Sequence, residues 1–183
     1  MVKLNRIYTR TGDAGTTGLA DGSRIAKTDP RMIAIGEVDE ANSALGLAIV
    51  ALGDHPLAAT LMRVQNDLFD LGADLATPVG IDGALRIVAS QVERLEGDID
   101  ALNEHLAPLT SFILPGGSAA AAALHLARAV TRRAERAAVA IADSANPQAL
   151  AYLNRLSDLL FCAARAVNKN GSADVLWVPG ASR

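Results

Sequence analysis

Residues 56–75 read PLAATLMRVQNDLFDLGADL, and this stretch decides the fold class. Its apolar residues recur at alternating spacings of four and three, which places them on one side of an α-helix. They are Leu57, Leu61, Val64, Leu68, Leu71 and Leu75. Such alternation is typical of long helices packed side by side, and Pro56 suits a first helical turn because its missing N–H would be unpaired there anyway. The stretch therefore predicts a long helix with one face buried in a bundle.

Helical spacing of apolar residues continues on both sides of this stretch. Residues 31–52 form the first predicted helix, with a stripe made by Ile35, Val38, Leu45, Ile49 and Leu52. Three more helices are predicted behind sequence caps: from the capping box Ser90-Gln91-Val92-Glu93 to Pro108, from Ser118 to about residue 141, and from Asn146-Pro147 to about residue 168. No β alternation of useful length and no internal repeat occurs, so the prediction is an all-α five-helix bundle.

The chain length of 183 residues fits a single domain covering residues 1–183. Within it we expect a functional loop over residues 1–30, the helical bundle over 31–170 and a C-terminal tail over 171–183. Hydrophobic residues make up 50% of the chain but aromatic residues only 3%, so the apolar content is mostly Ala, Leu, Val and Ile, which favours closely packed helices. A formal net charge of -3 argues against a general nucleic-acid-binding protein.

Single residue types exclude further classes. Cys162 is the only cysteine, so an intrachain disulfide and a Cys-rich zinc site are excluded, and Cys162 is expected to be a buried small hydrophobe. The histidines His55, His105 and His125 lie on different segments without ligand spacing, so we expect no metal site from them. The sequence has neither an apolar run of about 18 residues nor the apolar stretch of a signal peptide, and the expected location is the cytoplasm.

Residues 1–30 differ from the rest in being rich in Thr, Gly, Asp, Arg and Lys without a helical period. We interpret them as an ordered loop, and a disordered tail is the alternative. Residues 9–18 read TRTGDAGTTG, in which glycines let the backbone approach an anion and successive N–H groups can form a nest. Arg10 and Lys27 add positive charge. The ending of a Walker A loop is missing, so the stretch predicts a phosphate site of another kind or a surface turn.

A row of arginines supports the phosphate interpretation. Arg128, Arg132 and Arg136 are spaced four apart and share one face of the fourth predicted helix, with Arg133 on the adjacent face. Like charges at this spacing repel one another, and Glu135 neutralises only part of the row. Guanidinium groups match phosphate and carboxylate in fork geometry, so the row favours an anionic partner. The alternative is a solvated face paired with acids of other helices.

Three acidic groups are candidates for such pairing: Glu37, Asp39 and Glu40 on the first predicted helix, Asp70 and Asp74 on the second, and Asp98 and Asp100 on the third. Paired carboxylates are also found in acid–base and metal sites. We expect a salt bridge to arginine for Asp39 and solvated positions for the others. Asn154, on the otherwise apolar fifth helix, offers a donor and an acceptor, as adenine or ribose recognition requires.

Taken in order, these motifs resemble the PduO-type corrinoid adenosyltransferases, the ATP:cob(I)alamin adenosyltransferases, over nearly the whole chain. The resemblance rests on YTRTGDAGTTGLADGSRIAKTD at 8–29, GEVDEANSALG at 36–46, FILPGG at 112–117, RRAER at 132–136 and YLNRLSDLLF at 152–161. It implies a five-helix bundle assembled as a homotrimer with an active site at each subunit interface. ATP with Mg²⁺ and a corrinoid would be the bound molecules.

The resemblance also implies roles for particular residues. Around the triphosphate it places Thr9, Arg10, Thr11, Gly12, Thr17, Gly18 and Lys27, and facing the nucleotide Arg132, Arg133, Ala134, Glu135, Arg136 and Asn154. It implies a salt bridge between subunits from Asp39 to Arg128, and a Phe112 that packs by the corrin and displaces its lower ligand. Arg10 stands where many members of the family have Lys, which keeps the charge. For Trp177 in the tail we expect no corrin-covering role.

The implied reaction transfers the 5′-deoxyadenosyl group of ATP to cobalt and releases triphosphate. Cob(I)alamin is itself the nucleophile, which agrees with the absence of a Ser–His or His–carboxylate arrangement in the sequence. Orientation and charge stabilisation would be the protein's task. A cob(II)alamin reductase and an adenosylcobalamin-dependent enzyme are expected transient partners. The competing hypotheses are a phosphotransferase, a non-enzymatic helical trimer that carries or senses a corrinoid or nucleotide, and a scaffold without a small-molecule site.

Overall fold

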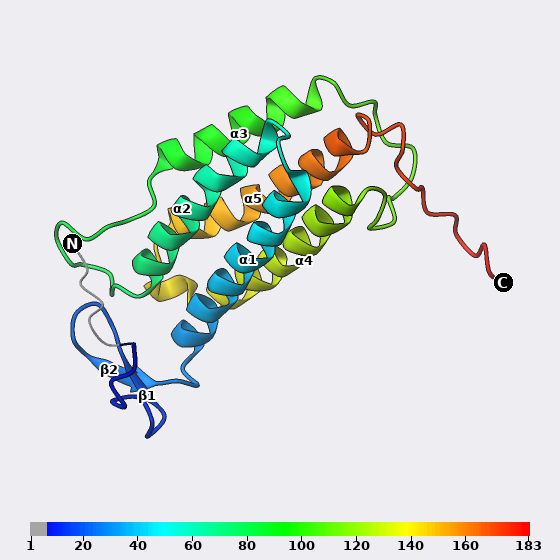
Figure 1. Ribbon diagram of the computed structural model, residues 1–183. Coiled ribbons are helices and arrows are strands. Elements are labelled where there is room, and N and C mark those ends of the chain that lie inside the picture. Colours follow the sequence, from blue (N-terminus) through cyan, green and yellow to red (C-terminus); the bar gives the residue numbers. More distant parts are fainter. Residues whose placement is uncertain (1–6) are drawn as a thin grey trace.

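The computed structural model describes residues 7–183 and contains five long helices (Figure 1). They are α1 (Pro30–Leu52), α2 (Leu57–Leu75), α3 (Ala89–Asn103), α4 (Ala119–Val139) and α5 (Pro147–Val167). Helix α1 packs on α2 and α4, and α5 packs on α3 and α4, so the predicted all-α five-helix bundle is confirmed. Among residues 7–183 no helix is long and apolar enough to cross a membrane.

The core seam of α1 is made mainly of alanine. Ala34, Val38, Ala41, Leu45 and Ala48 are buried and repeat the spacing of four and three seen in α2. Small side chains at alternate positions let α1 lie close to its neighbour α4. The stripe predicted from Ile35, Ile49 and Leu52 was only partly right, because these larger residues lie at the edge of the core and are half-buried.

The helix ends follow local capping chemistry. Ser118 Oγ accepts a hydrogen bond from Ala121 N at the start of α4, and Asn146 Oδ1 accepts one from Gln148 N at the start of α5, as predicted. Helix α3 differs from the prediction at both ends. It is Gln91, not Ser90, that caps it, since Gln91 Oε1 accepts from the backbone N–H of Val88. It also ends at Asn103, well before Pro108.

A buried carboxylate joins three helices in the core. Asp67 on α2 accepts hydrogen bonds from Tyr152 Oη of α5 at 2.8 Å, from Gln91 Nε2 of α3 at 2.9 Å and from Arg94 Nη2 of α3 at 2.5 Å. Burial and the nearby Asp67 charge raise the pKa of the Tyr152 hydroxyl, so it stays a donor. Every partner is a hydrogen-bond donor, which makes the network a structural tie between α2, α3 and α5.

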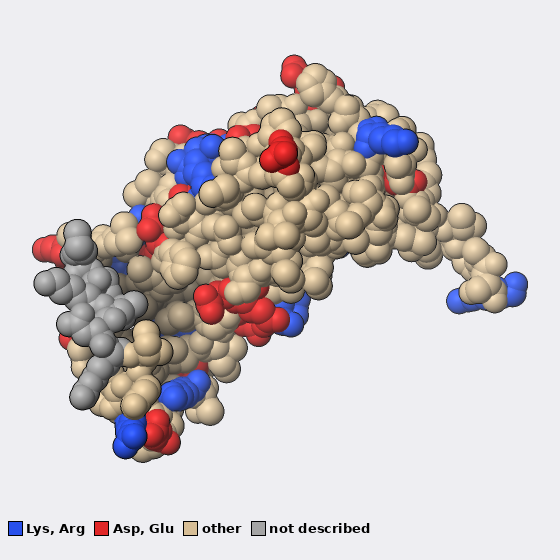
Figure 2. Space-filling model, in the orientation of Figure 1, with Lys and Arg blue, Asp and Glu red and all other residues tan. Residues whose placement is uncertain are grey.

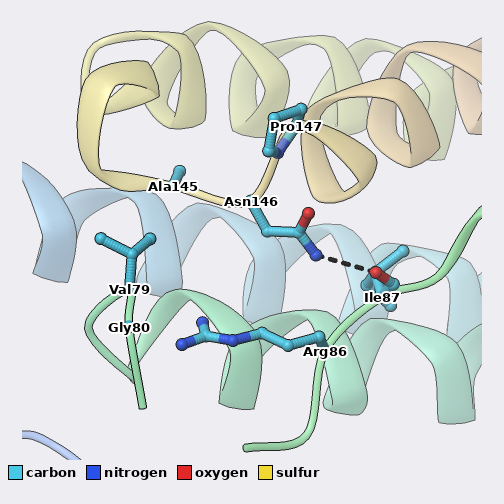
Figure 3. A pocket seen from close by; sticks show the side chains of 7 residues that line it. All are labelled: Val79, Gly80, Arg86, Ile87, Ala145, Asn146 and Pro147. Carbon is cyan, nitrogen blue, oxygen red and sulfur yellow. Dashed lines mark hydrogen bonds between the residues drawn. The ribbon is translucent and has the colours of Figure 1, made fainter. Parts of the chain in front are cut away.

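Asp74 forms a second buried tie, so the prediction that it is solvated was wrong. Its carboxylate accepts hydrogen bonds from Arg86 Nη1, Ile87 N and Asn146 Nδ2, at 2.7 to 2.8 Å. Asn146 also donates to the Ile87 carbonyl, as Figure 3 shows. Arg86 also donates hydrogen bonds to the carbonyls of residues 74, 77 and 78. The hollow of about 300 Å³ beside it therefore offers no free guanidinium to a ligand.

Candidate functional site

The glycine- and threonine-rich segment folds as an ordered hairpin, which confirms the ordered-loop interpretation over the described residues. Strands β1 (Thr16–Gly18) and β2 (Arg24–Ala26) pair antiparallel, with Thr17 opposite Ile25. Both strands were missed because three residues are too few to show an alternation. The dipeptide Asp21-Gly22 was the available signal for the turn. Asp21 accepts hydrogen bonds from Ser23 Oγ and Ser23 N, which lower the pKa of its carboxyl group.

Residues 9–15 wind back against this hairpin. Gly15 N donates to the Gly12 carbonyl at 3.1 Å, and Lys27 N donates to the Gly15 carbonyl at 2.9 Å. A Cβ atom on Gly12 would stand 3.2 Å from Lys27 Nζ, so the ammonium group lies directly beside the Gly12 backbone. The hydroxyls of Thr9 and Thr11 are hydrogen bonded at 2.9 Å. One short segment thus gathers backbone, hydroxyl and ammonium donors, and Thr17 and Gly18 lie on the adjoining strand.

The hairpin is attached to one end of the bundle. Ala20 N donates to the Ala76 carbonyl just beyond α2, at 3.1 Å. At the same end, Arg31 of α1 donates to the carbonyls of Leu75 and Ser144, which ties the start of α1 to the end of α2 and to the short 3₁₀ helix Ala142–Ser144 that follows α4. Figure 1 shows the hairpin at this end and the C-terminal tail at the other.

Arg128, the first member of the row on α4, is half-buried, and its Nε has no hydrogen-bond partner among the described residues. Burial lowers the pKa of its guanidinium, and the charge of Arg132 lowers it further. One turn earlier, His125 is 3% exposed, and within residues 7–183 neither of its ring nitrogens has a hydrogen-bond partner. Burial and then the Arg128 charge lower the pKa of His125, against an opposing effect of Asp174, which favours a neutral imidazole.

The other arginines of α4 differ in whether a carboxylate of the same chain pairs with them. Arg133 forms ion pairs with Glu37 and Glu40 of α1; the prediction of a solvated position was wrong for Glu37, which is half-buried, whereas Glu40 is exposed as expected although it is paired. The hydrogen bonds that Arg133 donates to Glu37 and Glu40 raise its pKa. Arg132 and Arg136 are exposed and make no ion pair within residues 7–183. These two remain available to an anionic ligand.

Asp39 also lies outside every ion pair of the described chain, and it is exposed. Its expected arginine partner is therefore absent within the single chain, and pairing across subunits stays a prediction. Of the other acids expected in solvent, Asp98 pairs with Arg63 at 2.6 Å and Asp70 is half-buried, whereas Asp100 is exposed as expected.

Asn154 and Glu135 face each other between α5 and α4. Asn154 Nδ2 donates to Glu135 Oε1 at 2.8 Å, and Asn154 Oδ1 accepts from Arg155 Nη1 at 3.3 Å, so the amide has a fixed orientation. Both residues reach solvent. Ala134, from the same motif as Glu135, is fully buried and presents no side chain to a ligand. Cys162 is buried as expected, and burial raises the pKa of its thiol.

Phe112 lies at the end of the bundle that is remote from the hairpin. Its side chain is 77% exposed, and its ring centroid lies 6.0 Å from that of Trp177. The tail residue Trp177 donates its backbone N–H to the Phe112 carbonyl at 2.7 Å, beside an antiparallel bridge between Ile113 and Leu176. Sequence reasoning missed this pairing of the 111–114 segment with the tail, whose signal was a short apolar run at each place.

Two remaining features bear on ligands. A groove of about 470 Å³ lies between α1 and α2, lined mainly by apolar side chains such as Met32, Ile35 and Phe69, with Asp39 at its wall. In the part of the chain that the structure describes, no three His, Cys, Asp or Glu side chains are grouped to hold a metal ion.

Comparison with known proteins agrees with these features. The family model described as cobalamin adenosyltransferase matches residues 7–167. A corrinoid adenosyltransferase of Mycobacterium tuberculosis is 54% identical, with 100% of this chain and 97% of that protein covered, and one of Bacillus subtilis is 45% identical, with 93% and 91% covered. A variant PduO-type ATP:corrinoid adenosyltransferase from Lactobacillus reuteri, complexed with cobalamin and ATP, superposes with a TM-score of 0.89 at 38% identity, covering 95% and 97% of the two chains. The chain therefore belongs to the cobalamin adenosyltransferase family and is an enzyme of its PduO type.

Proposed function

We propose that this chain transfers the 5′-deoxyadenosyl group of ATP to the cobalt of cob(I)alamin and releases triphosphate. One observation carries the proposal: the candidate site supplies many hydrogen-bond donors and, within the described residues, no histidine that could act as a general base. Residues 9–27 gather backbone, hydroxyl and ammonium donors, and Arg132 and Arg136 add two arginines without carboxylate partners in the described chain. Such groups bind and stabilise an anion, and they neither abstract a proton nor attack a carbon atom.

Triphosphate as leaving group accounts for this distribution of charge. When a nucleophile attacks C5′, negative charge grows on the phosphate chain as the C5′–O bond breaks. Donors fixed beforehand around that chain stabilise the transition state more than they stabilise bound ATP, which accelerates the reaction. Lys27 beside Gly12, together with Arg132 and Arg136, would supply this stabilisation. Mg²⁺, held mainly by phosphate oxygens, would add positive charge at the same place.

The reaction needs no general base, and no histidine near the arginine row is suited to that role among the described residues. His125, the histidine nearest in sequence to the arginine row, is buried with a lowered pKa and has no carboxylate partner. Cob(I)alamin is a strong nucleophile by itself, so the task left to the protein is to hold C5′ in line with cobalt. A phosphotransferase would require an acidic residue placed to accept a proton from an acceptor hydroxyl.

Phe112 would act on the second substrate. Keeping a phenylalanine ring 77% exposed leaves apolar area in water, which costs free energy unless a ligand covers it. We propose that this ring lies against the lower face of the corrin, excludes the lower axial ligand and favours the four-coordinate form of cob(II)alamin. That form is easier to reduce, so a partner reductase can supply the electron.

The site would lie between subunits of a homotrimer. The hairpin and the 104–118 segment that carries Phe112 are at opposite ends of the bundle, so one chain does not bring both to one reaction centre (Figure 1). Helices α1 and α4 keep large apolar side chains exposed, including Leu47, Val50 and Leu126. Figure 2 shows a broad area without charged side chains on the face where α1 and α4 lie, interrupted by a cluster of acidic side chains. A second subunit covering such an area would bring its own arginine row and Asp39 within reach of the first.

The first test is a product analysis. The protein is incubated without oxygen with ATP, Mg²⁺ and chemically reduced cobalamin. We expect the adenosylcobalamin spectrum to develop with one triphosphate released per cobalt–carbon bond formed. Formation of ADP in its place would make the chain a phosphotransferase, and binding of both molecules without any product would make it a carrier. Either result would overturn the proposal.

A second test addresses the shared site. Lys27→Ala removes a loop donor and Arg132→Ala removes a donor of the row, so each variant alone should be nearly inactive. After the two variants are unfolded and refolded together, random mixing leaves about a quarter of the interfaces with an intact loop from one chain and an intact row from the other. We expect activity to return to about that fraction. No recovery, despite mixed oligomers by mass spectrometry, would place the complete site in one chain.

A further inference from the structure

Arg24, the first residue of β2, has no part in the proposed function, although it makes the densest set of hydrogen bonds in the hairpin. Its Nη2 donates to the Thr11 carbonyl at 2.8 Å, to the Thr16 carbonyl at 3.1 Å and to Thr16 Oγ1 at 2.8 Å, and its Nε donates to Thr16 Oγ1 at 3.3 Å. The side chain is exposed, so burial does not impose this arrangement. An exposed arginine that bonds to carbonyl groups of its own loop fixes the shape of that loop.

The contact with Thr11 determines which way the next peptide N–H points. In a trans peptide, the carbonyl of one residue and the N–H of the next lie on opposite sides of the bond. Holding the Thr11 carbonyl on Arg24 therefore turns the Gly12 N–H to the other side. That N–H has no acceptor among the described residues, and the Lys27 ammonium lies beside the same glycine. A free N–H and an ammonium group at the same glycine can together bind a phosphate group.

The contact with Thr16 has a complementary effect. A carbonyl oxygen that faced the phosphate chain would repel it, and Arg24 keeps the Thr16 carbonyl occupied by a hydrogen bond of 3.1 Å. The positively charged side chains of the loop therefore have different roles. Arg24 is committed to two carbonyls and a hydroxyl, whereas Lys27 makes no ion pair in the described chain and Arg10 lies over the Tyr8 ring, at 5.6 Å from its centroid.

We propose that Arg24 is a positioning residue that shapes the 9–16 loop for a polyphosphate without touching it. The proposal rests on the proposed function, since the polyphosphate is the triphosphate of ATP. It differs from direct binding in one respect that can be measured. A direct phosphate contact needs the positive charge of residue 24, whereas positioning needs the planar fork that reaches two carbonyls and a hydroxyl at once.

Arg24→Lys keeps the charge and loses the fork, and Arg24→Gln loses both. For positioning, both variants should raise the KM for ATP to a similar extent, about tenfold, as expected when one set of charge-assisted hydrogen bonds is lost. The kcat should fall to a similar extent in both variants, because the misplaced loop donors also stabilise the transition state, and the KM for cobalamin should stay within about threefold of wild type. The matched control is Arg63→Lys, an exposed arginine on α2 that pairs with Asp98 and should change neither constant. Near-wild-type behaviour of Arg24→Lys beside a defective Arg24→Gln would overturn the proposal.

A second measurement does not depend on turnover. Amide hydrogen exchange of the ATP-free protein should be faster over residues 10–16 in both Arg24 variants and unchanged in the five helices. Thr16→Val, which removes only the hydroxyl acceptor, should show a smaller effect, and adding it to Arg24→Gln should change nothing further, because the partner is already gone. Exchange equal to wild type would overturn the proposal. If the wild-type protein made no adenosylcobalamin, the proposed function would fail, and this exchange measurement would still decide the role of Arg24.

Discussion

Replacing Arg132 with alanine should make the protein more stable and far less active. The side chain of Arg132 is exposed and forms no ion pair in the described chain, so its removal breaks no ion pair there. It stands one turn from Arg128 and one turn from Arg136, and its charge already lowers the pKa of Arg128. Two like-charged neighbours at this spacing cost roughly 0.2–0.5 kcal/mol each, and alanine has the higher helix propensity. The free energy of unfolding should therefore rise by about 0.5–1 kcal/mol.

The effect on activity has the opposite sign. Loss of one donor that stabilises charge in a transition state lowers the rate by roughly 10²-fold or more, which is about 2.7 kcal/mol. Urea denaturation of the ligand-free protein and the initial rate of adenosylcobalamin formation measure the two quantities on the same samples. The control is Arg63→Ala, which breaks the ion pair with Asp98 and should lower stability by less than about 1 kcal/mol with full activity. A near-wild-type rate for Arg132→Ala, or a loss of activity that follows a loss of stability, would refute the reasoning.

Three further predictions concern the corrin end, the core and pH. Phe112→Ala should lower the free energy of unfolding by only about 1 kcal/mol, since the ring is 77% exposed. The same variant should lose the spectrum of four-coordinate cob(II)alamin and most of its turnover. An unchanged spectrum would remove Phe112 from the mechanism. Asp74→Ala removes the buried acceptor that Arg86, Ile87 N and Asn146 share and should cost about 3 kcal/mol or more in urea denaturation; a loss below about 1 kcal/mol would contradict the network. Folding lowers the pKa of His125, so the unfolded chain binds a proton at this residue more readily than the folded chain. The free energy of unfolding should therefore have its full value above about pH 6.5 and should fall as the pH drops below that value. The slope between pH 7 and 5, measured by thermal unfolding, should be smaller in His125→Leu, and equal slopes would argue against a buried neutral imidazole.

The helices could be predicted from the sequence because their signals are local. The spacing in α2, the Ser118 cap and the Asn146-Pro147 cap each lie within a few residues of the feature they specify. The core seam of α1 was harder to predict. Alanine counts as only weakly apolar, so Ile35 and Ile49 gave the stronger signal, although close packing against α4 buries Ala34, Ala41 and Ala48 in preference.

Side-chain pairing depends on contacts that the sequence does not reveal. Asp74 reads as a surface acid on its helix, and only its meeting with a loop and with the cap of α5 makes burial favourable. Glu37 and Glu40 form ion pairs with Arg133 of α4, which lies more than ninety residues later in the chain. Sequence reasoning assigned no role to Arg24, because the turn that folds its guanidinium onto the loop carbonyls has to be seen in three dimensions. The tail beside Phe112 is a further long-range pairing of this kind.

The account depends most on which bond of ATP breaks. The direct measurement is a single turnover with reduced cobalamin and ATP that carries isotopically heavy oxygen at the bridge between C5′ and the first phosphorus atom. Attack of cobalt on C5′ leaves that oxygen on phosphorus, so the account predicts all of the label in the released triphosphate and none in the adenosyl group on cobalt. Label retained on the adenosine fragment, or lost to water, would mean that a phosphorus–oxygen bond is broken, and the assignment of the loop and the arginine row to a triphosphate leaving group would be wrong.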